Sequence, residues 1–246
     1  MFKRLLALTA ALTLAVPALA NKNPVLNQKV ASGDTVGNGE KVSSQPDVTP
    51  FTLDAMGCMI LRECTDEVYQ VFSLLDVSSL YDDPSRYTII ADEFNYMLTY
   101  LNQVGVDVFI AGPQHFKPGV RGLYHTQYNR FFLNAAYMDR PGTLMAVMRH
   151  EGWHAAQDCM AGTLDNTFAA IIKPEEDVPK LWRNMVERTY PKAMVPWEAE
   201  AWWAGKTAGM TVEALRACAS DKPMWEEIEP TPKTREWLVE KGFITK

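Results

Sequence analysis

The sequence lacks several features that mark large classes of protein. It has no long apolar run after residue 20, so we expect a soluble mature chain with no integral membrane segment. It has no excess of basic residues, because 24 Lys and Arg stand against 30 Asp and Glu, and this net charge of −6 argues against nucleic-acid binding. It has no Cys-x-x-Cys pair, so a zinc site built from cysteines is not expected. It has no internal repeat, and its length suits one domain with a proper core.

The first part of the chain has the order of segments found in a secretory signal peptide. Lys3 and Arg4 form a basic start, residues 5–16 form an apolar run, and Ala18-Leu19-Ala20 is a small-x-small cleavage site. The apolar run is too short to cross a bilayer, and a buried first helix is the alternative. We expect a signal peptide over residues 1–20 and a periplasmic or secreted protein. Loss of Lys3 and Arg4 would change the net charge from −6 to −8.

Residues 21–50 differ in composition from the rest of the mature chain. They are rich in Asn, Gly, Ser, Lys and Pro and contain almost no large apolar residues, which predicts a flexible N-terminal segment. A propeptide that covers an active site is the alternative. Residues 51–246 are then expected to form the folded domain.

The mature chain contains four cysteines, at positions 58, 64, 159 and 218. An even number of cysteines in an exported protein favours disulfides, although four buried free thiols are the alternative. Three pairings are possible, and sequence alone does not select one. Our hypothesis is a short local loop closed by Cys58–Cys64 and a longer connection closed by Cys159–Cys218.

Residues 51–246 predict mostly helices, with a few strands between them. Apolar residues at three- and four-residue spacing predict helices, and short β-branched or aromatic runs predict strands. The expected helices cover residues 54–75, 92–103, 143–160, 175–188, 196–206, 211–219 and 232–241, and the expected strands cover residues 106–110, 122–124 and 130–133. We therefore predict an α+β fold that is mostly helical, with a small sheet preceding an active-site helix.

That helix carries the sequence His150-Glu151-Gly152-Trp153-His154. Residues four apart lie on one face of a helix, so His150 and His154 can present two imidazoles to one ion while Glu151 reaches a water on it. Zinc lowers the pKa of such a water from about 16 toward 7, and a glutamate can take its proton as the water attacks a carbonyl. The motif predicts a zinc hydrolase with Glu151 as its base. Two ordinary histidines on a helix are the alternative.

A catalytic zinc normally has three protein ligands, so the motif needs another one. No histidine follows His154, and a carboxylate on a later helix becomes the candidate. Glu198 and Glu200 both lie on such a helix, but about 200° of helical rotation separates them, so at most one faces the metal. We favour Glu198, because the small residues Ala201 and Gly205 lie on its face and let that face approach another helix.

The motif followed by the helical stretch Glu198-Ala199-Glu200-Ala201 resembles the gluzincin branch of the zincin metallopeptidases. The similarity covers residues 150–201. In that family the two motif histidines and the first glutamate of the later stretch bind zinc, and the motif glutamate is the base. The resemblance implies these roles for His150, His154, Glu198 and Glu151. Residues 122–134 are similar to the edge strand that precedes the active-site helix in zincins and pairs with an extended peptide.

The sequence departs from the family at Trp202, where the family pattern has an aspartate that orients a zinc-binding histidine. Asp158 or Glu200 would have to replace it. The oxyanion of a tetrahedral intermediate also needs a hydrogen-bond donor. The available candidates for that donor are His115, His125, Tyr124 and Tyr190.

Together these features predict an exported zinc metallopeptidase that acts on a peptide or protein substrate. One alternative is a zincin-like zinc-binding or scaffold protein without catalysis. Another is a zinc amidase that acts on cell-wall peptides. The sequence leaves the oligomeric state open.

Overall fold

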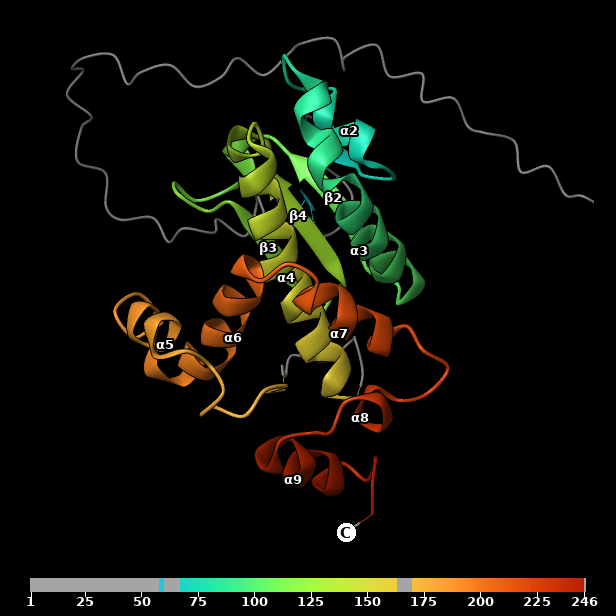
Figure 1. Cartoon of the computed structure of the whole chain (residues 1–246), viewed down its shortest axis with the longest axis vertical. Helices are drawn as coiled ribbons and strands as arrows, with labels where there is room; N and C mark the ends of the chain where they lie inside the picture. Colours follow the sequence, from blue (N-terminus) through green and yellow to red (C-terminus); the bar gives the residue numbers. More distant parts are fainter. Residues whose placement is uncertain (1–57, 60–66, 163–169, 246) are drawn as a thin grey trace, which may run out of the picture.

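The structure, a computed structural model, describes residues 58–59, 67–162 and 170–245. These residues form mostly helices and one four-stranded sheet, which confirms the expected α+β class (Figure 1). The strands are β1 (Val68–Gln70), β2 (Asp107–Ala111), β3 (Gly122–His125) and β4 (Arg130–Asn134). The α-helices are α2 (Leu74–Ser78), α3 (Ala91–Gln103), α4 (Pro141–Met160), α5 (Lys180–Val186), α6 (Val195–Lys206), α7 (Met210–Cys218), α8 (Met224–Glu227) and α9 (Pro232–Glu240). The 3₁₀ helices are η2 (Pro84–Ile90), η3 (Pro113–His115), η4 (Ala135–Tyr137) and η5 (Lys192–Met194).

The sheet has the strand order β1-β2-β4-β3. Its two central strands, β2 and β4, run parallel, with Val108 opposite Phe131. The outer strands β1 and β3 are antiparallel to their neighbours, and Tyr124 of β3 lies opposite the same Phe131. Strand β3 is therefore an edge strand, because β4 is its single partner among the described residues.

Helix α4 is the centre of the described structure. It contacts β3 and β4 as well as α3, α6, α7 and α8, and Figure 1 shows α6 and α7 flanking it. A helix that is covered on most sides needs apolar residues on most sides. Accordingly, Leu144, Met148 and Ala155 of α4 all have no exposed surface, and they belong to the main core cluster. The location of α4 places its histidine motif between the sheet and the C-terminal helices.

The N-terminal part of the described chain differs from the prediction. The single helix expected over residues 54–75 is wrong: Cys58 and Met59 are helical, but Val68–Gln70 form strand β1 and α2 begins only at Leu74. The β-branched and aromatic side chains of β1 suit a strand, and pairing with β2 satisfies its backbone. Ser73 and Asp76 then form a capping box that starts α2. The apolar residues of these two short elements have, in sequence, the spacing of a single amphipathic helix.

The later helices agree with the prediction within a few residues, with one exception. Helix α5 begins at Lys180 and not near residue 175. Pro179 explains the difference, because a proline restricts the residue before it, here Val178, to extended backbone. The single turn of α8 was not predicted, since it is too short to show a spacing pattern.

Some predictions concern residues outside the described part of the chain. They are the signal peptide over residues 1–20, the flexible segment over residues 21–50 and the first residues of the folded domain. Among the described helices, none is both long and apolar enough to cross a membrane.

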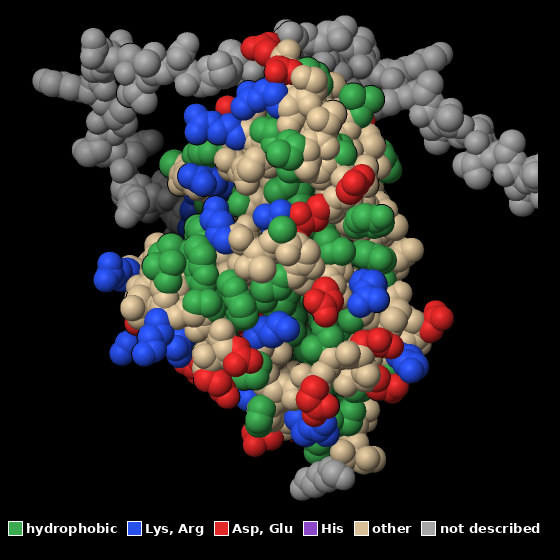
Figure 2. All heavy atoms as spheres, viewed as in Figure 1, with side chains coloured by type: hydrophobic (Ala, Val, Ile, Leu, Met, Phe, Trp, Pro, Cys, Tyr) green, Lys and Arg blue, Asp and Glu red, His purple; other side chains and the backbone are tan. Residues whose placement is uncertain are grey.

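Charged side chains are distributed unevenly over the surface. Figure 2 shows Lys and Arg gathered at the upper left of the face in view, near β3 and the start of α4, whereas its lower half carries both basic and acidic side chains.

Candidate metal centre

Helix α4 presents its histidines on the side away from α3 and α7. The rings of His150 and His154 lie one turn apart, with their centroids 4.9 Å from each other. Gly152 faces the core between them, and a Cβ there would lie 2.9 Å from the Met97 side chain and 3.1 Å from that of Thr211. Because α3 and α7 approach α4 so closely at Gly152, this side has no room for the histidine rings.

Helix α6 brings Glu198 to these histidines. Pro196 lies in the first turn of α6, where a proline favours helix initiation. Gly205 allows the two helices to come close, since a Cβ there would lie 3.1 Å from the carbonyl oxygen of Ala146 and 3.4 Å from Cβ of His150. The close approach expected from the small residues on this face is therefore present, and Glu198 is buried between the helices.

His150, His154 and Glu198 form a group that can hold a metal ion, with one ligand atom from each lying within 4.8 Å of the others. Nε2 of His150 lies 3.5 Å from Oε2 of Glu198, and Nε2 of His154 lies 3.8 Å from the same oxygen. Ligand atoms about 2.1 Å from a tetrahedral zinc are about 3.4 Å apart. The observed separations are close to this value.

The electrostatics of the group also suit a cation. Oε2 of Glu198 is buried and makes no hydrogen bond to the described residues, only the two long ion pairs with the imidazoles. Burial opposes ionisation of Glu198, but the two imidazoles hold its pKa well below its usual range. Burial also opposes protonation of His154, yet the adjacent Glu198 and Glu151 raise the pKa of His154 to about 9. A bound metal would replace the positive charge of that imidazole.

Glu200 faces a different side of α6 and is fully buried. It accepts hydrogen bonds from Nε1 of Trp153 at 3.1 Å, Nε2 of Gln157 at 2.7 Å, and the backbone N–H groups of Ile172 and Lys173 at 3.3 and 2.6 Å. Burial raises the pKa of Glu200 to about 7, although these donors act in the opposite direction. Of the two candidate carboxylates, the structure brings Glu198 to the histidines and leaves Glu200 in a hydrogen-bond network.

Gln157 connects this network to the metal centre. Its Oε1 lies 2.8 Å from Nδ1 of His154, while its Nε2 donates to Glu200 and to the carbonyl oxygen of Trp197. Because the amide Nε2 is used as a donor, Oε1 is left to accept a hydrogen bond from the Nδ1–H of His154, and Nε2 of His154 is directed to the centre. Sequence reasoning missed this residue. Its i+3 spacing from His154 on the same helix is the signal that could have identified it.

Glu151 lies between the histidines in sequence and contacts β3. Its Oε2 accepts a hydrogen bond from the backbone N–H of Tyr124 at 2.9 Å. Gly122 makes this contact possible, since a Cβ there would lie 2.4 Å from Cγ1 of Val147 and 3.2 Å from Cγ of Glu151. The edge strand therefore lies directly against the motif.

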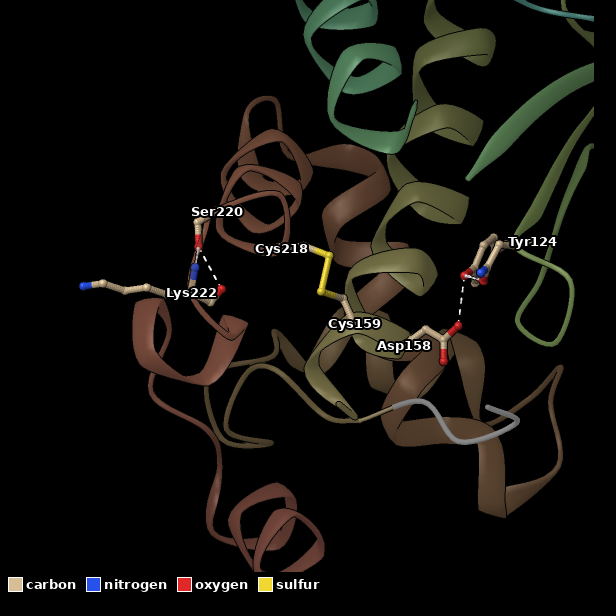
Figure 3. Close-up of a disulfide and its surroundings, with 7 residues drawn as sticks. Tyr124, Asp158, Cys159, Cys218, Ser220 and Lys222 are labelled. Atoms are coloured by element: carbon tan, nitrogen blue, oxygen red, sulfur yellow. Dashed lines mark hydrogen bonds between the residues drawn. A yellow bond between two sulfur atoms is a disulfide. The ribbon is translucent and has the colours of Figure 1, made fainter. Parts of the chain in front are cut away.

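The C-terminal end of α4 is fixed on two sides (Figure 3). On one side, the hydroxyl of Tyr124 donates to Asp158 at 2.9 Å, and on the other, a disulfide joins Cys159 to Cys218 of α7. Asp158 was one of the two residues expected to replace the missing family aspartate. It binds Tyr124 in place of a histidine, so the other residue, Glu200, is the one linked to His154, through Gln157.

The disulfide confirms the expected pairing of Cys159 with Cys218. Cys58 is also disulfide-bonded, but its expected partner, Cys64, lies outside the described residues. Disulfides fit a protein that folds in an oxidising compartment outside the cytoplasm.

The four candidate oxyanion donors lie in different places. Tyr190 lines the cleft next to His150 and Glu151, and burial together with the carboxylates of Glu198 and Glu151 raises its pKa to about 12. The hydroxyl of Tyr124 is occupied by Asp158, whereas His115 contacts Gln114 and His125 packs against Tyr128. Of the four candidates, Tyr190 alone brings its side chain to the cleft.

The cleft has a volume of about 640 Å³. His150 and Glu151 of α4, Gly122 of β3 and Trp202 of α6 all line it. Trp202 occupies the position of the family aspartate and packs edge-on against His150, with ring centroids 5.3 Å apart. The candidate metal centre thus opens into a space large enough for part of a peptide.

Comparison of the chain with protein-family models, curated proteins and solved structures found no match. The resemblance to gluzincins therefore depends on the motif of α4 and the carboxylate of α6.

Proposed function

We propose that this protein is an exported zinc metallopeptidase of the gluzincin type, with His150, His154 and Glu198 as metal ligands and Glu151 as catalytic base. The observation that carries the proposal is the meeting of these three side chains at one place, next to a cleft that His150 and Glu151 line. Two imidazoles and one carboxylate are a common ligand set of catalytic zinc. When bound, zinc supplies a Lewis acid that makes water nucleophilic at neutral pH.

Glu151 performs the proton transfers. One of its oxygens is held by the N–H of Tyr124, which fixes the orientation of the carboxylate. The carboxylate takes a proton from the attacking water and later gives it to the departing amine. Such a positioned base typically contributes a rate factor of about 10² to 10⁴.

Tyr190 stabilises the oxyanion that forms when water attacks the peptide carbonyl. A tyrosine hydroxyl is protonated at neutral pH and can donate a hydrogen bond, and burial with the nearby carboxylates raises the pKa of Tyr190 further, to about 12. The carboxylates that raise this pKa belong to the centre itself, which is consistent with a location beside the reacting carbonyl.

Strand β3 binds the substrate backbone. The carbonyl oxygen of Arg121 accepts from the N–H of Asn134 in β4, whereas the N–H of Tyr124 points away from β4 to Glu151. In an antiparallel pair these directions alternate, so the backbone groups of Gly122 also point away from β4. They line the cleft, where an extended peptide can pair with them.

The test compares the natural chain with Glu151→Gln. We expect about one zinc per chain in both proteins by metal analysis, and cleavage of casein that falls by about 10² to 10⁴ in the variant. The exposed Glu213→Gln on α7 is the matched control and should cleave like the natural chain.

Each contrary result favours a different alternative. If no zinc is bound after zinc soaking, the proposed centre is wrong. If zinc is bound but neither casein nor a cell-wall peptide is cleaved, the protein is a metal-binding scaffold. If cell-wall peptides are cleaved and casein is not, it is a zinc amidase.

A further inference from the structure

The cleft next to the metal centre is lined by three basic side chains, those of Arg121, Arg140 and Lys206. Glu151 is the sole carboxylate among the described residues that line it. The chain as a whole carries more acidic than basic residues, with a net charge of −6. The positive lining is therefore a local feature and not a consequence of the overall composition.

The three cations come from three elements that border the cleft. Arg121 immediately precedes β3, Arg140 is the N-cap of α4, and Lys206 is the last residue of α6. Lys206 follows Gly205, which contacts Ala146 and His150, and Arg121 precedes Gly122, whose Cβ position lies beside Glu151. Figure 2 shows basic side chains gathered near β3 and the start of α4. The basic side chains therefore line the cleft from the level of the metal centre to the start of α4.

These cations are available to a ligand. Within the described residues, Arg121 has its guanidinium over the ring of Tyr137 at 5.6 Å, and Lys206 has no ion pair. Arg140 lies 3.9 Å from the adjacent Asp139, and 77% of its side chain is exposed. The N-terminal end of α4 adds a positive partial charge at the same place, where Gly142 and Thr143 line the cleft.

The spacing along α4 gives the distance from the metal centre to Arg140. Arg140 precedes His150 by ten residues, which corresponds to about 15 Å along the helix axis. An extended peptide covers about 3.3 Å per residue, so about four residues of a substrate would lie between these two positions. A substrate whose scissile bond lies at His150 would place residues up to about five positions away beside the cations.

We propose that the substrates are acidic peptides, with Asp or Glu residues within about five positions of the scissile bond. The inference rests on the proposed function, since it uses the same cleft and the same metal centre. A cleft lined by charge of one sign concentrates ligands of the opposite sign and accelerates their binding. The excess of acidic groups elsewhere on the chain repels such peptides from other surfaces.

Binding can be measured without turnover by using zinc-loaded Glu151→Gln. Fluorescent peptides long enough to span the cleft would carry a run of Glu, Gln or Lys on either side of a fixed central sequence, and fluorescence anisotropy would give their affinities. We expect the Glu peptide to bind about tenfold more tightly than the Gln peptide at low salt, because each exposed ion pair contributes a factor of about 1.5 to 5. The preference should decrease at physiological ionic strength.

Charge-reversal variants of the cleft residues test which side chains cause the preference for acidic peptides. Adding Arg140→Glu or Lys206→Glu should weaken the Glu peptide about threefold to tenfold and leave the Gln peptide unchanged. Lys233→Glu, an exposed change on α9, is the matched control and should leave both affinities unchanged. Because the reversed residues are exposed, all variants should keep the melting temperature of the parent, and Lys206→Gln provides a milder version of the same test.

The proposal is overturned if the Glu, Gln and Lys peptides bind equally, if none binds, or if Lys233→Glu has the same effect as Lys206→Glu. Casein cleavage by the natural chain separates this result from a failure of the proposed function. If casein is cleaved in a zinc-dependent way but peptide binding shows no charge preference, the acidic substrate class is rejected and the proposed peptidase function stands.

Discussion

The two glutamates of α6, Glu198 and Glu200, have the same chemistry and opposite environments. Oε2 of Glu198 makes only long contacts with two imidazoles, whereas the carboxylate of Glu200 accepts four hydrogen bonds from neighbouring donors. Both are buried, so both need compensation for their charge. Glu200 obtains this compensation from hydrogen-bond donors of the protein, whereas Glu198 faces two imidazoles at a place where a metal ion can bind.

The difference originates in helix geometry. Residues two apart on a helix point about 200° away from each other, so Glu198 points to the histidines of α4 while Glu200 points to Trp153 and to the chain at Ile172 and Lys173. A buried carboxylate whose oxygens accept several hydrogen bonds from the protein stabilises the fold. A buried carboxylate oxygen without a hydrogen-bond donor marks a place where a ligand can bind.

Replacing Glu198 should have the largest effect on metal binding. We expect Glu198→Ala to weaken zinc by more than about a hundredfold, which is the upper end for residues that only support a ligand. A competition titration with a zinc chelator would measure this affinity. The exposed Glu213→Ala on α7 removes the same charge and should leave zinc binding unchanged. Equal affinity for Glu198→Ala and the natural chain would remove this residue from the centre.

Replacing Glu200 should instead have its main effect on folding. Glu200→Ala leaves the indole N–H of Trp153 and the backbone N–H groups of Ile172 and Lys173 without their acceptor. Each buried unpaired donor costs about 1 to 3 kcal/mol, so we expect the free energy of unfolding to fall by at least about 3 kcal/mol. Urea unfolding of the metal-free proteins would measure it. If Glu198→Ala lowers the free energy of unfolding of the metal-free protein as much as Glu200→Ala does, the proposed difference between the two carboxylates is wrong.

The sequence predicted the elements that carry the centre, because their signals are local. Three signals can be read from neighbouring positions in the sequence. They are the spacing of His150 and His154, the small residues near Glu198 and the strands over residues 122–133. The same local reasoning separated Glu198 from Glu200, because helical rotation allows at most one of them to face the metal and the small residues Ala201 and Gly205 lie on the face of Glu198. The centre could be anticipated because its three ligands lie on only two helices.

Other features depend on contacts between distant segments, and sequence spacing could not reveal them. Strand β1 forms because β2 is available to pair with it, so a strand interrupts the single helix expected over residues 54–75. The hydrogen bonds from the chain at residues 172–173 to Glu200 join positions far apart in sequence. The selection of Tyr190 from four candidate donors likewise required the shape of the cleft.

Gln157 joins the two environments, and its replacement should give the smallest effect of the three. Its Oε1 contacts Nδ1 of His154 while its Nε2 donates to Glu200. Gln157→Met keeps a side chain of similar length without either hydrogen bond. We expect zinc affinity to fall by about tenfold, the lower end for a residue that orients a ligand, because His154 loses the partner that fixes its tautomer.

A purely structural role for Gln157 would not change the histidine itself, so the decisive measurement is the tautomer of His154. Nitrogen NMR of the zinc-loaded protein should show Nδ1 of His154 protonated and Nε2 bound in the natural chain, and a mixture or faster exchange in Gln157→Met. Gln114→Met, an exposed change beside His115, is the matched control. An unchanged His154 spectrum with weaker zinc binding would assign the loss to packing, and the link between Glu200 and the metal centre would then have no functional effect.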